Sequence, residues 1–244
     1  MLQRQLMVAR KKRVKIVRNG NLGNYSWDST SSSDNSGYGY NVWETKDENS
    51  SSTLNILLNN YYYNSKNNQV CYNGEAFASV SCSFGSVGLD ATARNLIDDS
   101  VWYLGGGSST AINPKTSYEM ERGNVVFADF ADVAKTQTVE KVGLLYPSDY
   151  GYAADKNICT KNLKEYSDTT CTNNNYLYFG KNYWFLTSGS KYSFTAWYAK
   201  STGIVSAGGY TCDNGGVYPV VYLKANVNIV SGTGTYNSPY RLSI

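Results

Sequence analysis

The chain has 244 residues and a formal net charge of +3, with 41% hydrophobic but only 17% charged residues and no histidine. This length suffices for one large domain or two small ones, and the low charge means that Asn, Ser, Thr, Tyr and Gly must supply the polar surface. The absence of His excludes a Ser-His-Asp triad, a Cys-His pair and the usual zinc sites. With its 23 Tyr, the composition is typical of secreted β-rich proteins and of binding surfaces.

Basic residues are concentrated at the start of the chain. Seven of the 22 Lys and Arg residues precede position 19, with no acid among them, which leaves 15 basic and 19 acidic residues for the rest. The seven are Arg4, Arg10, Lys11, Lys12, Arg13, Lys15 and Arg18. A basic arm can bind nucleic acid, but neither a nucleic-acid motif nor a long basic helix follows this one. We therefore expect residues 1–13 to be a start region outside the domain, and we expect no nucleic-acid partner.

The rest of the sequence, 14–244, predicts one domain with few helices and many short strands. Its first element is an edge strand at Val14–Val17. A helix is predicted at Leu54–Asn60, where leucines recur at helical spacing, with Ser52 or Thr53 as its N-cap.

A longer helix is predicted at Leu89–Leu104, where apolar residues recur every three or four positions before Gly105–Gly107. A short helix is predicted at Lys161–Tyr166. The remaining strands are predicted, in chain order, at Val139–Leu145, Tyr183–Leu186, Ala196–Lys200, Gly203–Ala207 and Val217–Leu223.

Four of the five cysteines form two closely spaced pairs. Cys71 and Cys82 are 11 positions apart, Cys159 and Cys171 are 12 apart, and both pairs enclose polar, loop-like sequence. We expect two disulfides that close small loops, each stabilising by about 3 kcal/mol in the chain-entropy model; unpaired buried cysteines are the alternative. Cys212 would then lie outside both bonds.

The sequence contains no segment that we expect to insert into a membrane. No stretch of about 18 apolar residues could span one, and the basic start lacks the continuous apolar segment of a secretory signal. Together with the expected disulfides, this predicts an extracellular or cell-surface protein whose export segment is missing from this chain, without direct membrane insertion.

Four stretches resemble a family of uncharacterised secreted and pilin-associated domains from gut Firmicutes. They follow in the same order at 14–29 (VKIVRNGNLGNYSWDS), 143–153 (GLLYPSDYGYA), 183–190 (YWFLTSGS) and 215–242. The family typically ends in GVRPVVYLKSNV, to which GGVYPVVYLKANV is similar. The resemblance implies a C-type-lectin-like fold, related to that of formylglycine-generating enzymes. Such a fold is a single α+β domain with a mixed, mostly antiparallel sheet, two or three short helices, long loops, and adjacent N- and C-terminal strands.

The chain departs from the family's terminal motif at Tyr218, where the family has Arg. Tyr218 is either a packing substitute or part of an altered binding surface. The resemblance implies that Val217–Leu223 pairs with Val14–Val17. Some lectin-like domains are varied by diversity-generating retroelements, and the resemblance makes a diversified surface conceivable here.

The acidic residues form no recognisable catalytic motif. Three pairs are neighbours in the sequence: Asp98 and Asp99, Glu119 and Glu121, and Asp129 and Asp132. A glycosidase needs two acids facing each other across a cleft, so we interpret these as solvated surface acids. No sequence signature of a calcium-dependent lectin, an EF-hand or a phosphate-binding loop is present, so no metal or cofactor is expected. Calcium held by an Asp/Asn-rich loop such as Ser167–Asn175 is the alternative.

The segment from Tyr183 to Tyr218 is dense in Tyr, Trp, Ser, Gly and Asn, as antibody paratopes are. Trp184 and Trp197 lie in apolar strand patterns and are expected in the core, whereas the tyrosines either fill the core or form a recognition surface. The candidate ligand-binding residues are Tyr192, Tyr198, Lys200, Tyr210, Asp213 and Tyr218.

These features together favour a non-catalytic extracellular or cell-surface recognition domain that binds a protein or glycan partner. One alternative is a structural subunit of a pilus or other surface appendage. A carbohydrate-active enzyme is the second.

Overall fold

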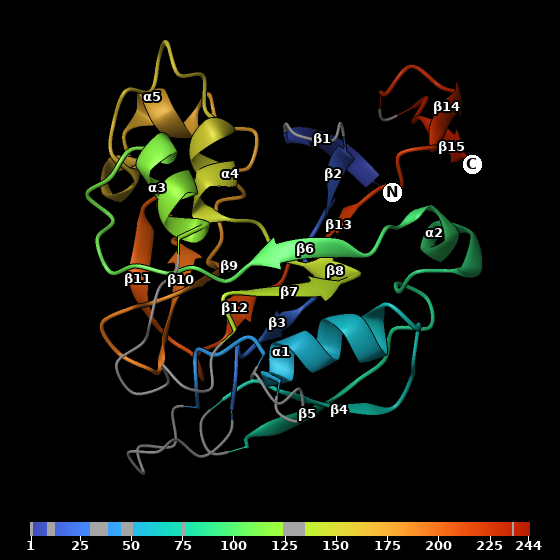
Figure 1. Ribbon diagram of the computed structural model, residues 1–244, viewed down its shortest axis with the longest axis horizontal. Helices are drawn as coiled ribbons and strands as arrows, with labels where there is room; N and C mark the ends of the chain where they lie inside the picture. Colours follow the sequence, from blue (N-terminus) through green and yellow to red (C-terminus); the bar gives the residue numbers. More distant parts are fainter. Residues whose placement is uncertain are drawn as a thin grey trace.

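The computed structural model describes residues 2–8, 13–29, 39–44, 51–74, 77–123, 135–235 and 237–244, the first of these as backbone alone (Figure 1). It is a mixed α+β structure of mostly antiparallel sheets and short helices. Asp129 and Asp132 lie outside the described residues.

Strands from the beginning and from the last quarter of the chain meet in a four-stranded sheet. Its strands, in spatial order, are β1 (Leu2–Val8), β2 (Arg13–Arg18), β13 (Val220–Tyr222) and β8 (Val142–Gly143). In the antiparallel pairing of β2 with β13, Val17 is opposite Val220 and Lys15 is opposite Tyr222. The expected adjacency of the first and last framework strands is therefore confirmed.

The start of the chain differs from expectation. Residues 2–8, expected to lie outside the domain, form β1 and pair along the whole length of β2. β2 is consequently an inner strand and not the edge strand predicted for Val14–Val17. Its middle residues Lys15, Ile16 and Val17 are all buried, as is usual for a strand covered on both faces.

A five-stranded sheet forms the second framework. Its order is β11 (Val205–Tyr210), β10 (Thr195–Ala199), β9 (Tyr183–Ser188), β12 (Gly215–Gly216) and β3 (Asn24–Tyr25). All six residues of β9 are buried, which explains its unbroken apolar run at the centre of the sheet. The pairing of β12 with β9 is parallel, and the others are antiparallel.

Three hairpin-like pairs complete the strands. They are β4 (Gln69–Tyr72) with β5 (Ser79–Cys82), β6 (Ser100–Tyr103) with β7 (Gln137–Glu140), and β14 (Asn228–Ser231) with β15 (Arg241–Ser243). The β14–β15 pair lies next to α2 and away from the five-stranded sheet (Figure 1).

The helices of the described chain are all short. They are α1 (Thr53–Ile56), which continues as the π-helix Leu57–Tyr62, α2 (Ala91–Leu96), α3 (Pro114–Glu121), α4 (Pro147–Tyr152), the 3-10 turn Leu163–Glu165 and α5 (Thr169–Thr172). The expected N-cap is confirmed, because the Ser52 side chain accepts a hydrogen bond from the Asn55 N–H.

The helix predicted at Leu89–Leu104 is wrong over its second half. α2 ends at Leu96, Ile97 pairs with Leu223, and β6 follows at Ser100–Tyr103. Burial alternates along β6, with Ser100 and Trp102 inside and Val101 and Tyr103 exposed. The spacing of the apolar residues is compatible with the period of a helix and with that of a strand. Pairing with β7 stabilises the strand.

The core is built around tryptophan. All five Trp side chains are buried, including Trp184 and Trp197 as expected. Trp27 packs edge-on against Trp43 at 5.2 Å and against Trp184 at 6.3 Å between ring centres, so one aromatic stack joins the loops to the five-stranded sheet.

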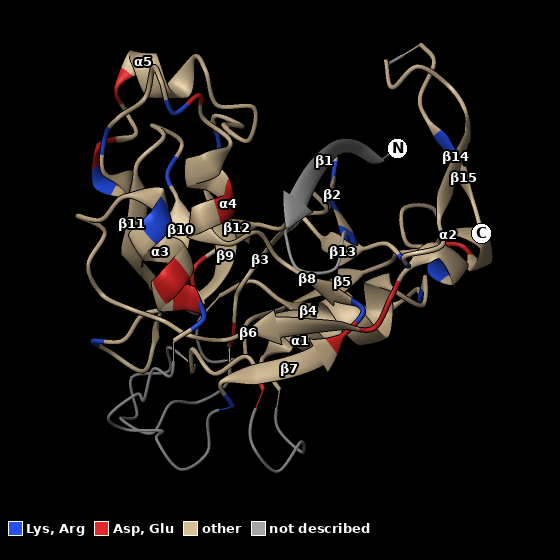
Figure 2. Ribbon diagram, turned by 45° about the horizontal axis from the view of Figure 1, so that its top comes forward, with Lys and Arg blue, Asp and Glu red and all other residues tan. Residues whose placement is uncertain are grey.

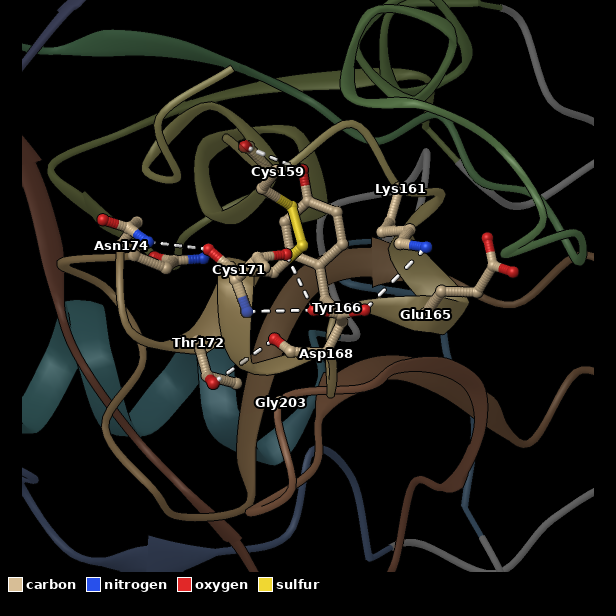
Figure 3. The surroundings of a disulfide bond; sticks show 12 residues. Cys159, Lys161, Glu165, Tyr166, Asp168, Cys171, Thr172, Asn174 and Gly203 are labelled. Carbon is tan, nitrogen blue, oxygen red and sulfur yellow. Dashed lines mark hydrogen bonds and ion pairs between the residues drawn. A yellow bond between two sulfur atoms is a disulfide. The ribbon is translucent and has the colours of Figure 1, made fainter. Parts of the chain in front are cut away.

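Both expected disulfides are present. Cys71–Cys82 joins β4 to β5, and Cys159–Cys171 closes the loop that leads into α5. Figure 3 shows the second bond beside Tyr166, whose hydroxyl donates to the Gly151 carbonyl at 3.0 Å. The loop is thereby tied to the C-terminal end of α4. Cys212 is buried and belongs to neither bond.

Thiol counting tests this pairing. The oxidised chain, denatured without reductant, should expose one reactive thiol, from Cys212, and all five after reduction. Denaturation is needed because Cys212 is buried in the folded protein. A count above one in the oxidised sample would contradict the two bonds.

Candidate functional site

A pocket of about 280 Å³ lies along the five-stranded sheet. Its lining residues are Asn182, Trp184, Tyr198, Gly209, Asp213, Asn214 and Gly215. They come from the start of β9, from β10 and β11, and from the turn that joins β11 to β12. Chain segments that are distant in the sequence thus meet here because the sheet order places β11, β10, β9 and β12 side by side.

Trp184 forms the floor of the pocket. Its side chain is only 2% exposed, and its indole Nε1 donates to the Tyr25 carbonyl oxygen at 2.9 Å. Tyr198 is half-buried and meets the indole edge-on at 5.9 Å between ring centres. The hydrogen bond and the ring contact hold both aromatic side chains in one orientation before any ligand arrives.

Two glycines let the backbone pass directly over this floor. A Cβ atom at Gly215 would lie 2.4 Å from Trp184 Nε1, and one at Gly209 would lie 2.7 Å from Tyr198 Cδ1. Both distances are too short for any side chain, so glycine is required at each position for Trp184 and Tyr198 to keep their places.

The rim of the pocket is polar. Asn182, Asp213 and Asn214 are exposed, and they supply amide and carboxylate groups around the aromatic floor. The Asn182 Oδ1 accepts from the Ser201 N–H at 2.8 Å, and the Asp213 N–H donates to the Tyr210 carbonyl at 2.9 Å. These bonds position the rim, which can then hydrogen-bond a polar ligand resting on the rings.

The structure brings together only part of the predicted site. Tyr198 and Asp213 line the pocket, and the Lys200 Nζ lies 5.9 Å from the centre of the Tyr198 ring. Tyr192 and Tyr210 belong to another group, with Phe194 between them at 5.4 and 5.8 Å. They are 47% and 44% exposed, so they form an aromatic surface patch next to the hairpin turn between β9 and β10.

Tyr218 is a correction to the predicted surface. It is 5% exposed, stacks on Phe179 at 4.3 Å and meets Tyr183 edge-on at 5.2 Å. Burial also raises the pKa of its hydroxyl. Tyr218 lies between β12 and β13, where the chain crosses from one sheet to the other, and its ring packs on Phe179 and on Tyr183 of β9. It is a core residue, as the packing alternative stated.

Sequence reasoning missed most of the lining. Asn182, Trp184, Gly209, Asn214 and Gly215 were not among the predicted ligand-binding residues. The turn Asp-Asn-Gly-Gly was a usable signal, because Asp and Asn tolerate tight turns and Gly permits close approach. That the turn faces Trp184 follows only from the sheet order.

The four of these acids that the structure describes all have ionic partners, and one of them is buried. Asp98 pairs with Arg13 at 2.9 Å, and Asp99 pairs with Lys141 at 2.7 Å. Glu119 pairs with Lys115 on α3, and Glu121, which is fully buried against expectation, pairs with Arg122 at 3.1 Å.

Within the described ranges, no group of three or more His, Cys, Asp or Glu residues is placed to hold a metal ion. A helix long and apolar enough to cross a membrane is likewise not found among the residues that the structure describes. Comparisons with protein-family models, with curated proteins and with solved structures found no match.

Proposed function

We propose that this protein is an extracellular or cell-surface recognition domain that binds a glycan in the pocket over Trp184. The observation that carries the proposal is the pairing of a fixed aromatic floor with exposed amide and carboxylate groups. A sugar ring has an apolar face and a rim of hydroxyl groups. The partly exposed Tyr198 ring, which Trp184 supports from below, can cover the face while Asn182, Asp213 and Asn214 hydrogen-bond the hydroxyls.

The sequence resemblance supports the same proposal. A C-type-lectin-like fold, which we propose for this chain, places the terminal strands together and leaves long loops for binding. The antiparallel β2–β13 pairing agrees with that arrangement. Two disulfides agree with an oxidising, extracellular location.

Glycan binding can be tested on an oligosaccharide array followed by titration of the best ligand. Asp213→Ala and Asn214→Ala should each weaken binding about tenfold or more, which corresponds to about 1.4 kcal/mol per lost contact set. Asn226→Ala, an exposed amide removed from another turn, serves as the matched control and should bind as the wild type does.

Two results would contradict the proposal. One is an array without any bound glycan. The other is a bound glycan whose affinity is equal in the pocket variants and the control. Cleavage of the bound oligosaccharide during incubation would instead indicate the carbohydrate-active enzyme named above.

One observation favours the structural alternative, a subunit of a surface appendage. The β14–β15 pair carries exposed apolar residues, namely Ile229 and Val230, with Tyr240 and Ile244 beside them. Exposed apolar side chains on a strand pair can mark a protein contact. Light scattering across a concentration series tests it: assembly that Ile229→Ser and Val230→Ser abolish would support this alternative, and a monomer at every concentration would oppose it.

A further inference from the structure

Lys15 is the least expected residue of the core. It lies in the middle of β2 and is 0% exposed. Its Nζ is surrounded by three rings, at 4.5 Å from the centre of Tyr146, 5.6 Å from Tyr222 and 5.7 Å from Trp102. A lysine ammonium is seldom buried in this way, because removing it from water is costly.

The group that Lys15 contacts is the carboxylate of Asp149. The Nζ touches Asp149 Oδ2, so the pair joins β2 to α4 across 134 positions of sequence. The same oxygen accepts the Tyr146 N–H at 2.8 Å, as the capping interaction of α4. The carboxyl carbon is therefore held next to the amine in a site that solvent hardly reaches.

A third buried group is bonded to Ser148, the residue that precedes Asp149 in α4. Glu121 of α3 is 0% exposed, accepts the N–H of Ser148 at 2.8 Å together with the Ser148 hydroxyl, and pairs with Arg122 at 3.1 Å. Helices α3 and α4 both carry acidic residues close to the sheets (Figure 2). Burial, with a contribution from the Asp149 charge, raises the pKa of Glu121 to about 7, so this carboxyl holds a proton in mildly acidic solution.

We propose that Lys15 and Asp149 condense to an isopeptide bond between Nζ and Cγ, with Glu121 as the proton carrier. A proton first passes from the ammonium to the carboxylate, which gives a neutral amine and a carboxylic acid. The amine attacks Cγ, a C–N bond forms, and the C–OH bond breaks. Glu121 takes the amine proton and returns a proton to the departing hydroxyl, which leaves as water.

The arrangement favours this reaction on three grounds. The reactants are fixed in contact, so little entropy is lost on the way to the transition state. The product amide is neutral and removes two buried charges. The low solvent access of the site opposes hydrolysis, which is the reverse reaction. No oxidant, reductant or external co-reactant is needed.

Intact-mass measurement of the oxidised protein tests the bond. The wild-type chain should be lighter, by the mass of one water, than the sequence with two disulfides. Digestion with trypsin after reduction should give a branched peptide in which residues 14–18 are joined to residues 142–156. Trypsin should not cleave after Lys15, because its side chain is acylated.

Two variants separate the parts of the proposal. Lys15→Arg keeps a buried cation but lacks a nucleophilic amine, so it should show the full mass. Glu121→Gln keeps the shape of the proton carrier and should slow or abolish the loss of water. A wild-type chain of full mass after prolonged incubation, with normal cleavage after Lys15, would show an ordinary ion pair and overturn the proposal. Bond formation at the wild-type rate in Glu121→Gln would overturn the role of Glu121.

Discussion

Replacing Trp184 with alanine should lower the free energy of unfolding by about 3–5 kcal/mol, the range typical for a buried Trp. The indole is 2% exposed, packs against Trp27 and Tyr198, and donates to the Tyr25 carbonyl. Its removal would leave a cavity in the five-stranded sheet and an unsatisfied carbonyl oxygen. Chemical denaturation with the disulfides intact measures the loss.

Tyrosines of the same segment provide the controls. Tyr210→Ala should cost less than about 1 kcal/mol, because the ring is 44% exposed. Tyr218→Ala should approach the cost of Trp184→Ala, because Tyr218 is buried against Phe179 and Tyr183. An equal loss in Tyr210→Ala and Tyr218→Ala would contradict the division of these residues into surface and core.

The protein should be more stable at pH 5 than at pH 8, as far as Glu121 determines stability. Burial raises the pKa of this carboxyl from 4.5 to about 7 in the folded state. Between these values the folded chain holds a proton that the unfolded chain has released. The free energy of unfolding therefore falls as the pH rises through about 7, by up to about 3 kcal/mol for a shift of this size.

Glu121→Gln isolates this contribution. The amide imitates the protonated acid, and its Nε2 can donate to the Ser148 hydroxyl, which accepts when it rotates. Denaturation midpoints measured from pH 4.5 to 8 should decline less steeply with pH in this variant than in the wild type. If the denaturation midpoints of the two proteins decline equally steeply with pH, Glu121 is not the cause of the decline.

A second buried carboxyl should add to the same trend. Burial raises the pKa of Glu140 to about 6, although the Trp43 Nε1 donates to it at 2.9 Å and the Asn55 amide at 2.7 Å. Glu140→Gln should flatten the decline between about pH 4.5 and 6, whereas Glu121→Gln should flatten it up to about pH 7. If stability declines with pH as steeply in Glu140→Gln as in the wild type, this assignment is wrong.

Several features of this protein were determined by the sequence alone because they are local. Ser52 caps α1 through the adjacent Asn55 N–H, and the two disulfides close loops whose cysteines are near one another along the chain. The apolar run of β9 is long and dense enough to predict a strand in any context. The pairing of the terminal strands came from the family resemblance, not from local pattern.

The tertiary structure determined those features that depend on which other parts of the chain pack against a residue. Leu89–Leu104 carries spacing compatible with a helix, and only the pairing with β7 turns Ser100–Tyr103 into a strand. Tyr210 and Tyr218 stand in similar Gly-rich sequence, yet Tyr210 is exposed and Tyr218 is buried against Phe179 and Tyr183. The pocket over Trp184 and the contact of Lys15 with Asp149 likewise join distant positions. Composition and periodicity report which side chains prefer burial, but the partners that bury them are set by strand order and register.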